Sequence, residues 1–185
     1  MSGGSANAAA PDGRPRRAAV VVASTSAAAG LAEDLTGPAI RDWLRDHGFD
    51  TAEPAIVADG EAVGAAVRTA LVAGAAVVVT TGGTGVSPSD RTPEEVASLL
   101  DQQLPGIVEE IRRRGLASTP MSVITRGVAG FAGDAFVVTL PGSPGGVRDG
   151  LAVLEDVLEH LLDQRTGPRP GHGDSRNGAP EPSER

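Results

Sequence analysis

The chain has 185 residues, 40% of them hydrophobic, which is the composition of one globular domain of ordinary size. Its 16 basic residues are all arginine and it has no cysteine, which excludes P-loop lysines, Schiff bases, thiolate nucleophiles, disulfides and cysteine-ligated metals. The net charge of −8 and the few aromatic residues disfavour nucleic acid as a partner, and no apolar run predicts a membrane span or a signal peptide, so we expect a cytoplasmic protein.

Two terminal segments, 1–17 and 165–185, are rich in glycine, proline and polar residues and show no hydrophobic periodicity. Such a composition predicts disordered tails. The sequence therefore predicts a single folded domain over residues 18–164, with a tail on each side.

Within this domain, the hydrophobic pattern predicts alternating strands and helices. Strands are predicted at 18–24, 52–57, 75–80 and 135–140. Helices are predicted at 37–47, 61–73, from Thr92 through Leu100, at 107–115 and at 147–162.

The alternation of these elements predicts an α/β fold, a three-layer sandwich in which a mainly parallel sheet carries helices on both faces. The run AAVVVT at 75–80 is almost entirely apolar, as in a strand that is buried on both faces. In sheets of this kind, ligands bind at the carboxyl ends of the strands, so the loops that follow strands are the candidates for chemistry.

The densest signal is the loop after the third predicted strand, which reads TTGGTGVSPSDRTPE over residues 80–94. Glycines let the backbone approach a ligand closely, and their N–H groups together with the next helix N-terminus attract an anion. We interpret this segment as a phosphate-binding loop, with a tight turn as the alternative. It is neither a Walker loop, which needs lysine, nor a dinucleotide loop, because Pro88 stands where the last glycine would be.

Two carboxylates, Asp59 and Asp90, are predicted at the same edge of the sheet as this loop. They could form a magnesium site, because Mg²⁺ commonly uses one or two carboxylates together with substrate phosphates and water. Each also has a structural alternative: Asp59 could cap the helix that follows it, and Asp90 could fix a turn.

Two further positions have alternatives that the sequence leaves open. Ser143, in LPGSPGG at 140–146, could contact a ligand or cap the last helix, with Pro144 at the first helical position. Arg126 lies between the last predicted helices and could reach a phosphate.

At these motifs the chain resembles the MogA/MoaB family of molybdenum cofactor biosynthesis, the molybdopterin adenylyltransferases. The resemblance covers about residues 18–164 and is carried by five motifs in order. These are TTGGTG at 80–85, P-x-D-x-T-P-E at 88–94, LPG at 104–106, T-R-x-x-x-G at 125–130 and LPGSP at 140–144. The resemblance implies the α/β fold predicted above and a homotrimer.

The resemblance also implies a reaction: transfer of AMP from Mg-ATP to the terminal phosphate of molybdopterin, with release of pyrophosphate. Two aspartates essential to that reaction match Asp59 and Asp90, which are the implied catalytic residues and Mg²⁺ ligands. The implied substrate contacts are Ser24, Thr36, Gly37, Thr81, Gly82, Gly83, Thr84, Gly85, Pro141, Gly142, Ser143 and Pro144. Where many members have Ser-Asp after the first strand, this chain has Ser24-Thr25, so that acidic side chain is missing.

The sequence leaves two alternatives to this activity open. A paralogue could bind molybdopterin without adenylylating it and act as an oligomeric binding protein, although the presence of both aspartates argues against that. A related domain of the competence-damage type, acting on nucleotide derivatives, would be expected to have a second domain. If the chain is an adenylyltransferase, we expect its product to pass to a molybdenum-insertion protein.

Overall fold

The structure is a computed structural model that describes residues 15–167, so residues 1–14 and 168–185 of the tails predicted at 1–17 and 165–185 lie outside the described residues. Within these described residues, seven strands form one sheet. They are β1 (Arg17–Ala23), β2 (Asp50–Thr51), β3 (Ala55–Val57), β4 (Val77–Thr81), β5 (Gln102–Gln103), β6 (Ala129–Ala132) and β7 (Ala135–Leu140). The order across the sheet is β2-β1-β4-β7-β6-β5, with β3 also paired to β1.

The sheet is parallel at its centre and antiparallel at one edge. Strand β1 pairs parallel with β2, β3 and β4, and β4 pairs parallel with β7. Strands β6 and β5 continue the sheet in antiparallel pairing. The predicted α/β class with a mainly parallel sheet is therefore confirmed.

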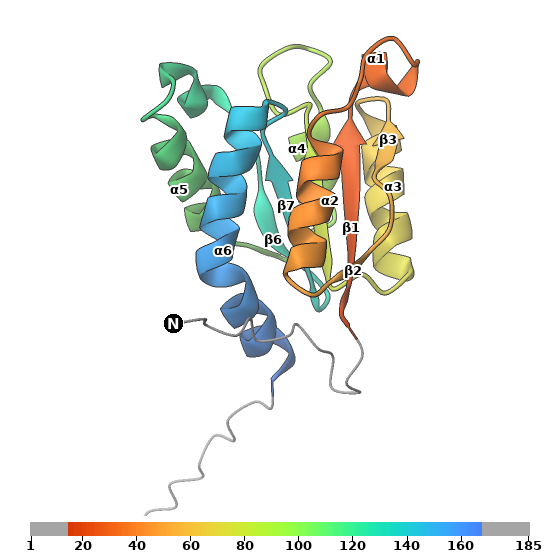
Figure 1. Cartoon of the computed structure of the whole chain (residues 1–185), viewed down its shortest axis with the longest axis vertical. Helices are drawn as coiled ribbons and strands as arrows, with labels where there is room; N and C mark the ends of the chain where they lie inside the picture. The colour runs from red at the N-terminus through yellow and green to blue at the C-terminus, as the bar shows by residue number, and fades with distance from the viewer. Residues whose placement is uncertain (1–14, 168–185) are drawn as a thin grey trace, which may run out of the picture.

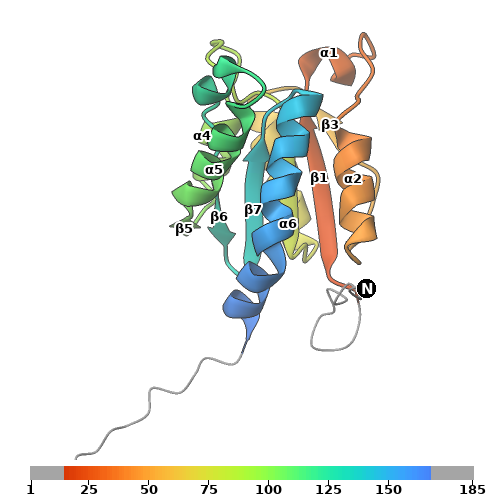
Figure 2. The same cartoon turned by 60° about the vertical axis from the view of Figure 1, so that its left-hand side comes forward.

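Helices cover both faces of the sheet (Figures 1 and 2). They are α1 (Thr25–Ala28), α2 (Gly37–Asp46), α3 (Glu61–Val72), α4 (Thr92–Ala97), α5 (Pro105–Gly115), the 3₁₀ helix η1 (Pro120–Ile124) and α6 (Pro144–Thr166). The core on one face joins the sheet to α2, α5 and α6. The core on the other face joins it to α3 and α4.

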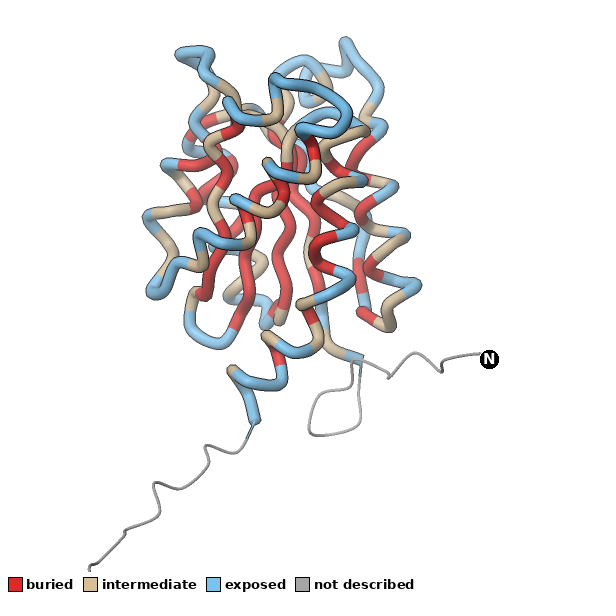
Figure 3. The backbone as a smooth tube through the Cα atoms, turned by 90° about the vertical axis from the view of Figure 1, so that its left-hand side faces the viewer, coloured by how far each residue is buried: buried red, intermediate tan, exposed pale blue. Residues whose placement is uncertain are grey.

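The central strands are buried on both faces, as Figure 3 shows for the interior of the molecule. In β4, Val77 and Val79 belong to the core with α2, α5 and α6, whereas Val78 belongs to the core with α3 and α4. A parallel strand covered by helices on both sides needs apolar residues at successive positions, which explains the continuous apolar run.

The register of the strands places their carboxyl ends together. Val22 in β1 is paired with Thr81 in β4, and Thr81 is paired with Leu140 in β7. The three loops that follow these strands consequently begin side by side, at the upper edge of the sheet in Figure 1.

The single strand predicted at 52–57 was wrong. Only β3 lies within this range; β2 ends just before it, at Thr51, and Pro54 lies between the two strands. Proline has no N–H to donate to a strand ladder, so the pairing with β1 is interrupted there.

Strands β5 and β6 were not predicted from the sequence. Strand β5 has only two residues, and β6 contains Gly130, which weakens its hydrophobic pattern. A Cβ at Gly130 would overlap the carbonyl oxygen of Gln102, so the close approach of the two strands requires glycine there.

Some boundaries also differ from the predictions. Helix α4 ends at Ala97, before Leu100, and the last helix runs from Pro144 to Thr166 instead of stopping at 162. Arg165, predicted in the tail, donates to the Gly133 carbonyl at 2.6 and 3.0 Å, which favours the extra turn of α6. Within residues 15–167 no helix is both long and apolar enough to cross a membrane.

Truncating the core side of α6 should measure how strongly this helix is bound to the sheet. Leu154 is fully buried, so we expect Leu154→Ala to lower the free energy of unfolding by about 2–5 kcal/mol in urea denaturation. Val72 is 90% exposed, and Val72→Ala is the control that should change it by less than about 0.5 kcal/mol. Equal effects of the two substitutions would contradict the packing described here.

Candidate functional site

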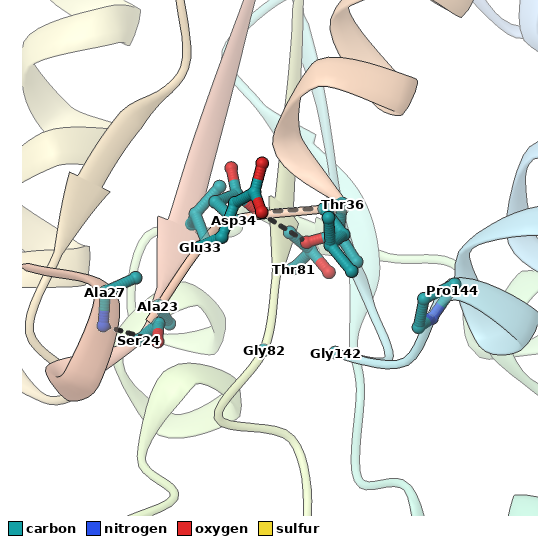
Figure 4. Close-up of a pocket in the computed structure, with 12 residues that line it drawn as sticks. Ala23, Ser24, Ala27, Glu33, Asp34, Thr36, Thr81, Gly82, Gly142 and Pro144 are labelled. Carbon is teal, nitrogen blue, oxygen red and sulfur yellow. Dashed lines mark hydrogen bonds between the residues drawn. The ribbon is translucent and has the colours of Figure 1, made fainter. Parts of the chain in front are cut away.

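Three adjoining cavities open at the carboxyl ends of β1, β4 and β7. The threonine cavity, of about 230 Å³, is lined by residues that include Ser24, Asp34, Thr36, Thr81, Gly82 and Gly142 (Figure 4). The aspartate cavity, of about 530 Å³, is lined by residues that include Ser24, Thr25, Asp59, Gly83 and Asp90. The η1 cavity, of about 510 Å³, is lined by residues that include Gly83, Thr84, Gly85, Asp90, Met121 and Arg148.

The glycine-rich loop borders all three cavities. Its first two glycines adopt backbone conformations that other residues rarely adopt. Gly82 has φ of 89° and Gly83 has φ of 59°. A Cβ at Gly82 would overlap the Ala23 carbonyl oxygen, and a Cβ at Gly83 would overlap the carboxylate of Asp59. Both positions therefore require glycine for backbone conformation and for close approach.

The same loop is held against the loop that follows β7. The backbone N–H of Gly82 donates to the Leu140 carbonyl at 3.3 Å, and the Thr81 hydroxyl donates to the Pro141 carbonyl at 2.9 Å. A Cβ at Gly142 would lie 3.0 Å from the Cα of Gly82. The two glycine-containing loops thus pack backbone against backbone.

Asp59 binds the segment that leads into α4. Its Oδ1 accepts from the backbone N–H of Gly60 at 2.7 Å, from that of Arg91 at 3.1 Å and from the Thr92 hydroxyl at 3.4 Å. The capping alternative for Asp59 was wrong, because the N-cap residue of α3 is Gly60. Asp59 instead joins two loops that are 32 residues apart in the sequence.

Asp90 lines the aspartate cavity together with Asp59. Its Oδ2 accepts from the backbone N–H of Ser87 at 2.9 Å, so the predicted turn-fixing contact is present. A Cβ at Gly85 would lie 2.7 Å from the same oxygen, which makes Gly85 another position that favours glycine. Asp90 also lines the η1 cavity, so it lies at the junction of the two spaces.

The two aspartates are suited to share a hard cation with a substrate. Among the described residues, Asp59 Oδ2 and Asp90 Oδ1 accept no hydrogen bond, so each carboxylate keeps one oxygen for a ligand. Two carboxylate oxygens are a common protein contribution to a Mg²⁺ site, with phosphates and water completing the octahedron. In residues 15–167 no group of three or more His, Cys, Asp or Glu side chains could hold a metal ion.

Arg126 fixes the glycine-rich loop and does not project freely toward a phosphate. Its Nε donates to the Gly85 carbonyl at 2.6 Å, its Nη2 donates to the Asp90 carbonyl at 2.5 Å, and its Nη1 pairs with Glu94. The hydrogen bond from Arg126 lowers the pKa of Glu94, against a smaller opposing effect of burial. One guanidinium therefore holds three parts of the segment 85–94.

The predicted substrate contacts near β1 and α2 fall into two groups, those that line a cavity and one that is buried in the packing. Ser24 and Thr36 line the threonine cavity, and Asp34 Oδ1 accepts from the Thr36 backbone N–H at 2.9 Å and its hydroxyl at 3.0 Å. Gly37 is buried, and a Cβ there would overlap Asp34 and come within 2.8 Å of the Val22 side chain. Gly37 is therefore a packing residue in the described structure and not part of a cavity wall.

The predicted contacts after β7 and within the glycine loop do line cavities. Pro141, Gly142 and Ser143 line the η1 cavity and Pro144 lines the threonine cavity. Ser143 is also the N-cap of α6, since its hydroxyl accepts from the Gly146 N–H at 3.1 Å. Thr84 lines the η1 cavity and accepts a buried hydrogen bond from another threonine hydroxyl, that of Thr125, at 3.0 Å.

Two parts of the site were not predicted from the sequence. Asp34 was not singled out, although an acidic residue just before Thr36 and a helix start is a recognisable local capping pattern. The short helix η1, which supplies Met121 and Ile124 to one wall, gave no periodic signal because it is a single 3₁₀ segment.

A family model and a solved structure both relate this chain to molybdopterin proteins. Residues 19–160 match the model of the family described as "Probable molybdopterin binding domain". The structure of the molybdopterin biosynthesis Mog protein from Mycobacterium ulcerans superposes with a TM-score of 0.78 at 51% identity, over 81% of this chain and 99% of that one.

Two curated relatives differ in length. The molybdenum cofactor biosynthesis bifunctional protein of Synechococcus elongatus is 41% identical over 78% of this chain but only 46% of its own length. The molybdopterin adenylyltransferase of Helicobacter pylori is 31% identical over 78% of this chain and 84% of its own length. The chain thus spans about half the length of the two bifunctional relatives that it matches.

A matched pair of glycine substitutions tests the packing of Gly83 against Asp59. Gly83 and Gly133 have φ of 59° and 58°, but a Cβ at Gly133 would meet nothing within 4 Å. Gly133→Ala therefore measures the backbone penalty alone. We expect Gly83→Ala to lower the free energy of unfolding by at least about 1 kcal/mol more than Gly133→Ala in urea denaturation. Equal losses would mean that Gly83 is not confined by the aspartate.

The pair between Glu94 and Arg126 should give the stability a pH dependence of known sign. The pKa of Glu94 is lower in the folded chain than its ordinary value of 4.5, so its contribution is complete above that value and disappears as pH falls through the lower folded value. Because both side chains are partly exposed, we expect Glu94→Gln to lower the free energy of unfolding by less than about 1 kcal/mol at neutral pH.

The same substitution should make the loss of stability below pH 4.5 less steep, since the titrating carboxylate is gone. Urea denaturation at several pH values between about 7 and 3 measures both effects. An acid limb as steep as that of the unmodified chain would rule out this contribution of Glu94.

Proposed function

The chain belongs to the family of molybdopterin-binding domains that includes MogA and MoaB, and on this basis we propose that it is a molybdopterin adenylyltransferase of molybdenum cofactor biosynthesis. In this reaction an oxygen of the terminal phosphate of molybdopterin attacks the α-phosphorus of ATP. A new P–O bond forms to AMP, and the bond to the β-phosphate breaks to release pyrophosphate. The proposal is supported by relatives named as molybdopterin adenylyltransferases, including that of Escherichia coli.

The observation that carries the proposal is the shared cavity of Asp59, Asp90 and Gly83. Adenylyl transfer requires two anionic groups to be brought together and their charge to be neutralised, and it needs no covalent enzyme nucleophile. This suits a chain without cysteine or lysine. The attacking phosphate is largely ionised at neutral pH, since its second pKa is about 6, so a general base is not required.

We assign a positioning role to the chain's own groups. The backbone amides of residues 83–85 would bind substrate phosphate, because the glycines of this segment leave room for an anion next to the backbone. Asp59 and Asp90 would hold Mg²⁺, which supplies charge neutralisation to the phosphates and to the departing pyrophosphate. Arg126 keeps the Asp90 loop in place through the two carbonyl contacts.

The remaining substrate contacts are proposed where predicted residues line the cavities. These are Ser24, Thr36, Thr81, Thr84, Pro141, Gly142, Ser143 and Pro144. The binding-only alternative predicts no turnover, so the adenylylation assay described below distinguishes it from the proposed adenylyltransferase. The homotrimer, the cytoplasmic location and the transfer of product to a molybdenum-insertion protein stay predictions.

Conservative substitution of the two aspartates tests the assignment directly. Asn keeps one oxygen for the backbone donors but removes the charge, so we expect Asp59→Asn and Asp90→Asn each to lower ATP-dependent adenylylation of molybdopterin at least about 100-fold. Asp46→Asn, on the exposed side of α2, makes the same change of charge away from the site and should leave the rate unchanged.

The fold of each variant is checked by urea denaturation before the rates are compared. Turnover that survives in both aspartate variants would exclude them as metal ligands. An unmodified chain that binds both substrates without forming adenylylated product would favour the binding-only alternative.

A further inference from the structure

Arg148 is a positively charged side chain in the wall of the η1 cavity with no partner in the described part of the chain. It follows the first turn of α6, and its Nη2 lies 3.8 Å from the position that a Cβ of Gly145 would occupy. Arg148 thus lines the same cavity as Ser143 and Gly83–Gly85. Within residues 15–167 it makes no hydrogen bond or ion pair.

The other guanidinium beside the glycine-rich loop is already engaged. Arg126 binds two backbone carbonyls and pairs with Glu94, so its charge is largely neutralised and its donors are occupied. Because the chain contains no lysine, only arginine can supply a permanent positive side-chain charge to a bound anion. Arg148 is the arginine that lines the η1 cavity, and its five N–H donors are available.

The cavity around Arg148 also has acidic and apolar walls. Asp90 and Asp149 line it, so without Arg148 the side-chain charge facing an entering phosphate would be entirely negative. Met121 and Ile124 form an apolar wall, with 60% and 39% of their surfaces exposed. A guanidinium, backbone amides and an apolar wall in one cavity suit a phosphate ester that carries a flat heterocyclic ring.

We infer that Arg148 binds the phosphate of one of the two substrates in the η1 cavity and thereby sets affinity for that substrate. The inference rests on the proposed adenylyl transfer for the identity of the substrates, since both ATP and molybdopterin are phosphate esters of ring systems. Arg148 contacts the phosphate and leaves the reacting oxygen and phosphorus to the loop and the aspartates. It therefore affects substrate binding more than the chemical step.

The test compares Arg148→Gln, Arg148→Lys and the unmodified chain by calorimetric titration with ATP and, separately and anaerobically, with molybdopterin. Arg68→Gln is the matched control, because Arg68 is an exposed arginine on α3, outside the three cavities, and its loss changes the net charge equally. We expect Arg148→Gln to raise the Kd of one substrate about 10- to 100-fold, Arg148→Lys to raise it less, and Arg68→Gln to leave it unchanged.

The substrate whose Kd rises identifies the phosphate that Arg148 binds. In steady-state assays the same variant should raise KM with little change in kcat, and its thermal unfolding midpoint should equal that of the unmodified chain. Unchanged Kd values for both substrates, or an equal rise with Arg68→Gln, would overturn the inference. If the unmodified chain binds both substrates but shows no turnover, the proposed function fails, while the Kd comparison still decides the role of Arg148.

Discussion

The arrangement depends on the close approach of the backbone after β4 to its two neighbouring loops. Gly82 packs against the Ala23 carbonyl on one side and against Gly142 on the other, and Gly83 packs against the Asp59 carboxylate. Any side chain at Gly82 or Gly83 would force these groups apart. Glycine is thus required in this loop because the ends of three strands lie close together.

Arg126 adds a second constraint, which the fold alone does not impose. The parallel register places the loops after β1, β4 and β7 side by side, but the long segment from Gly85 to Asp90 leaves the sheet edge. Arg126 binds the carbonyls at both ends of that segment, and the hydrogen bonds of Asp90 with Ser87 and of Asp59 with Arg91 help to hold it. A chain without lysine thus uses one arginine to build the site, and we assign a different one, Arg148, to the substrate.

The fold was predictable where a local pattern determines structure. The apolar runs of β1, β4 and β7 and the amphipathic pattern of α6 are legible in the sequence, and they suffice to place Asp59 and Asp90 at one edge. What was not predictable depends on contacts between distant residues. The hypothesis that Asp59 caps a helix was wrong, because its carboxylate binds the backbone of Arg91. The two-residue strand β5 forms only by pairing with β6.

The most direct test is a crystal structure of the chain with Mg²⁺ and a non-hydrolysable ATP analogue. We expect one metal ion in the aspartate cavity, with an oxygen of Asp59 and an oxygen of Asp90 each about 2.0–2.1 Å from it and phosphate oxygens completing its coordination. A nucleotide bound with its metal out of reach of both aspartates, or at another edge of the sheet, would contradict the account.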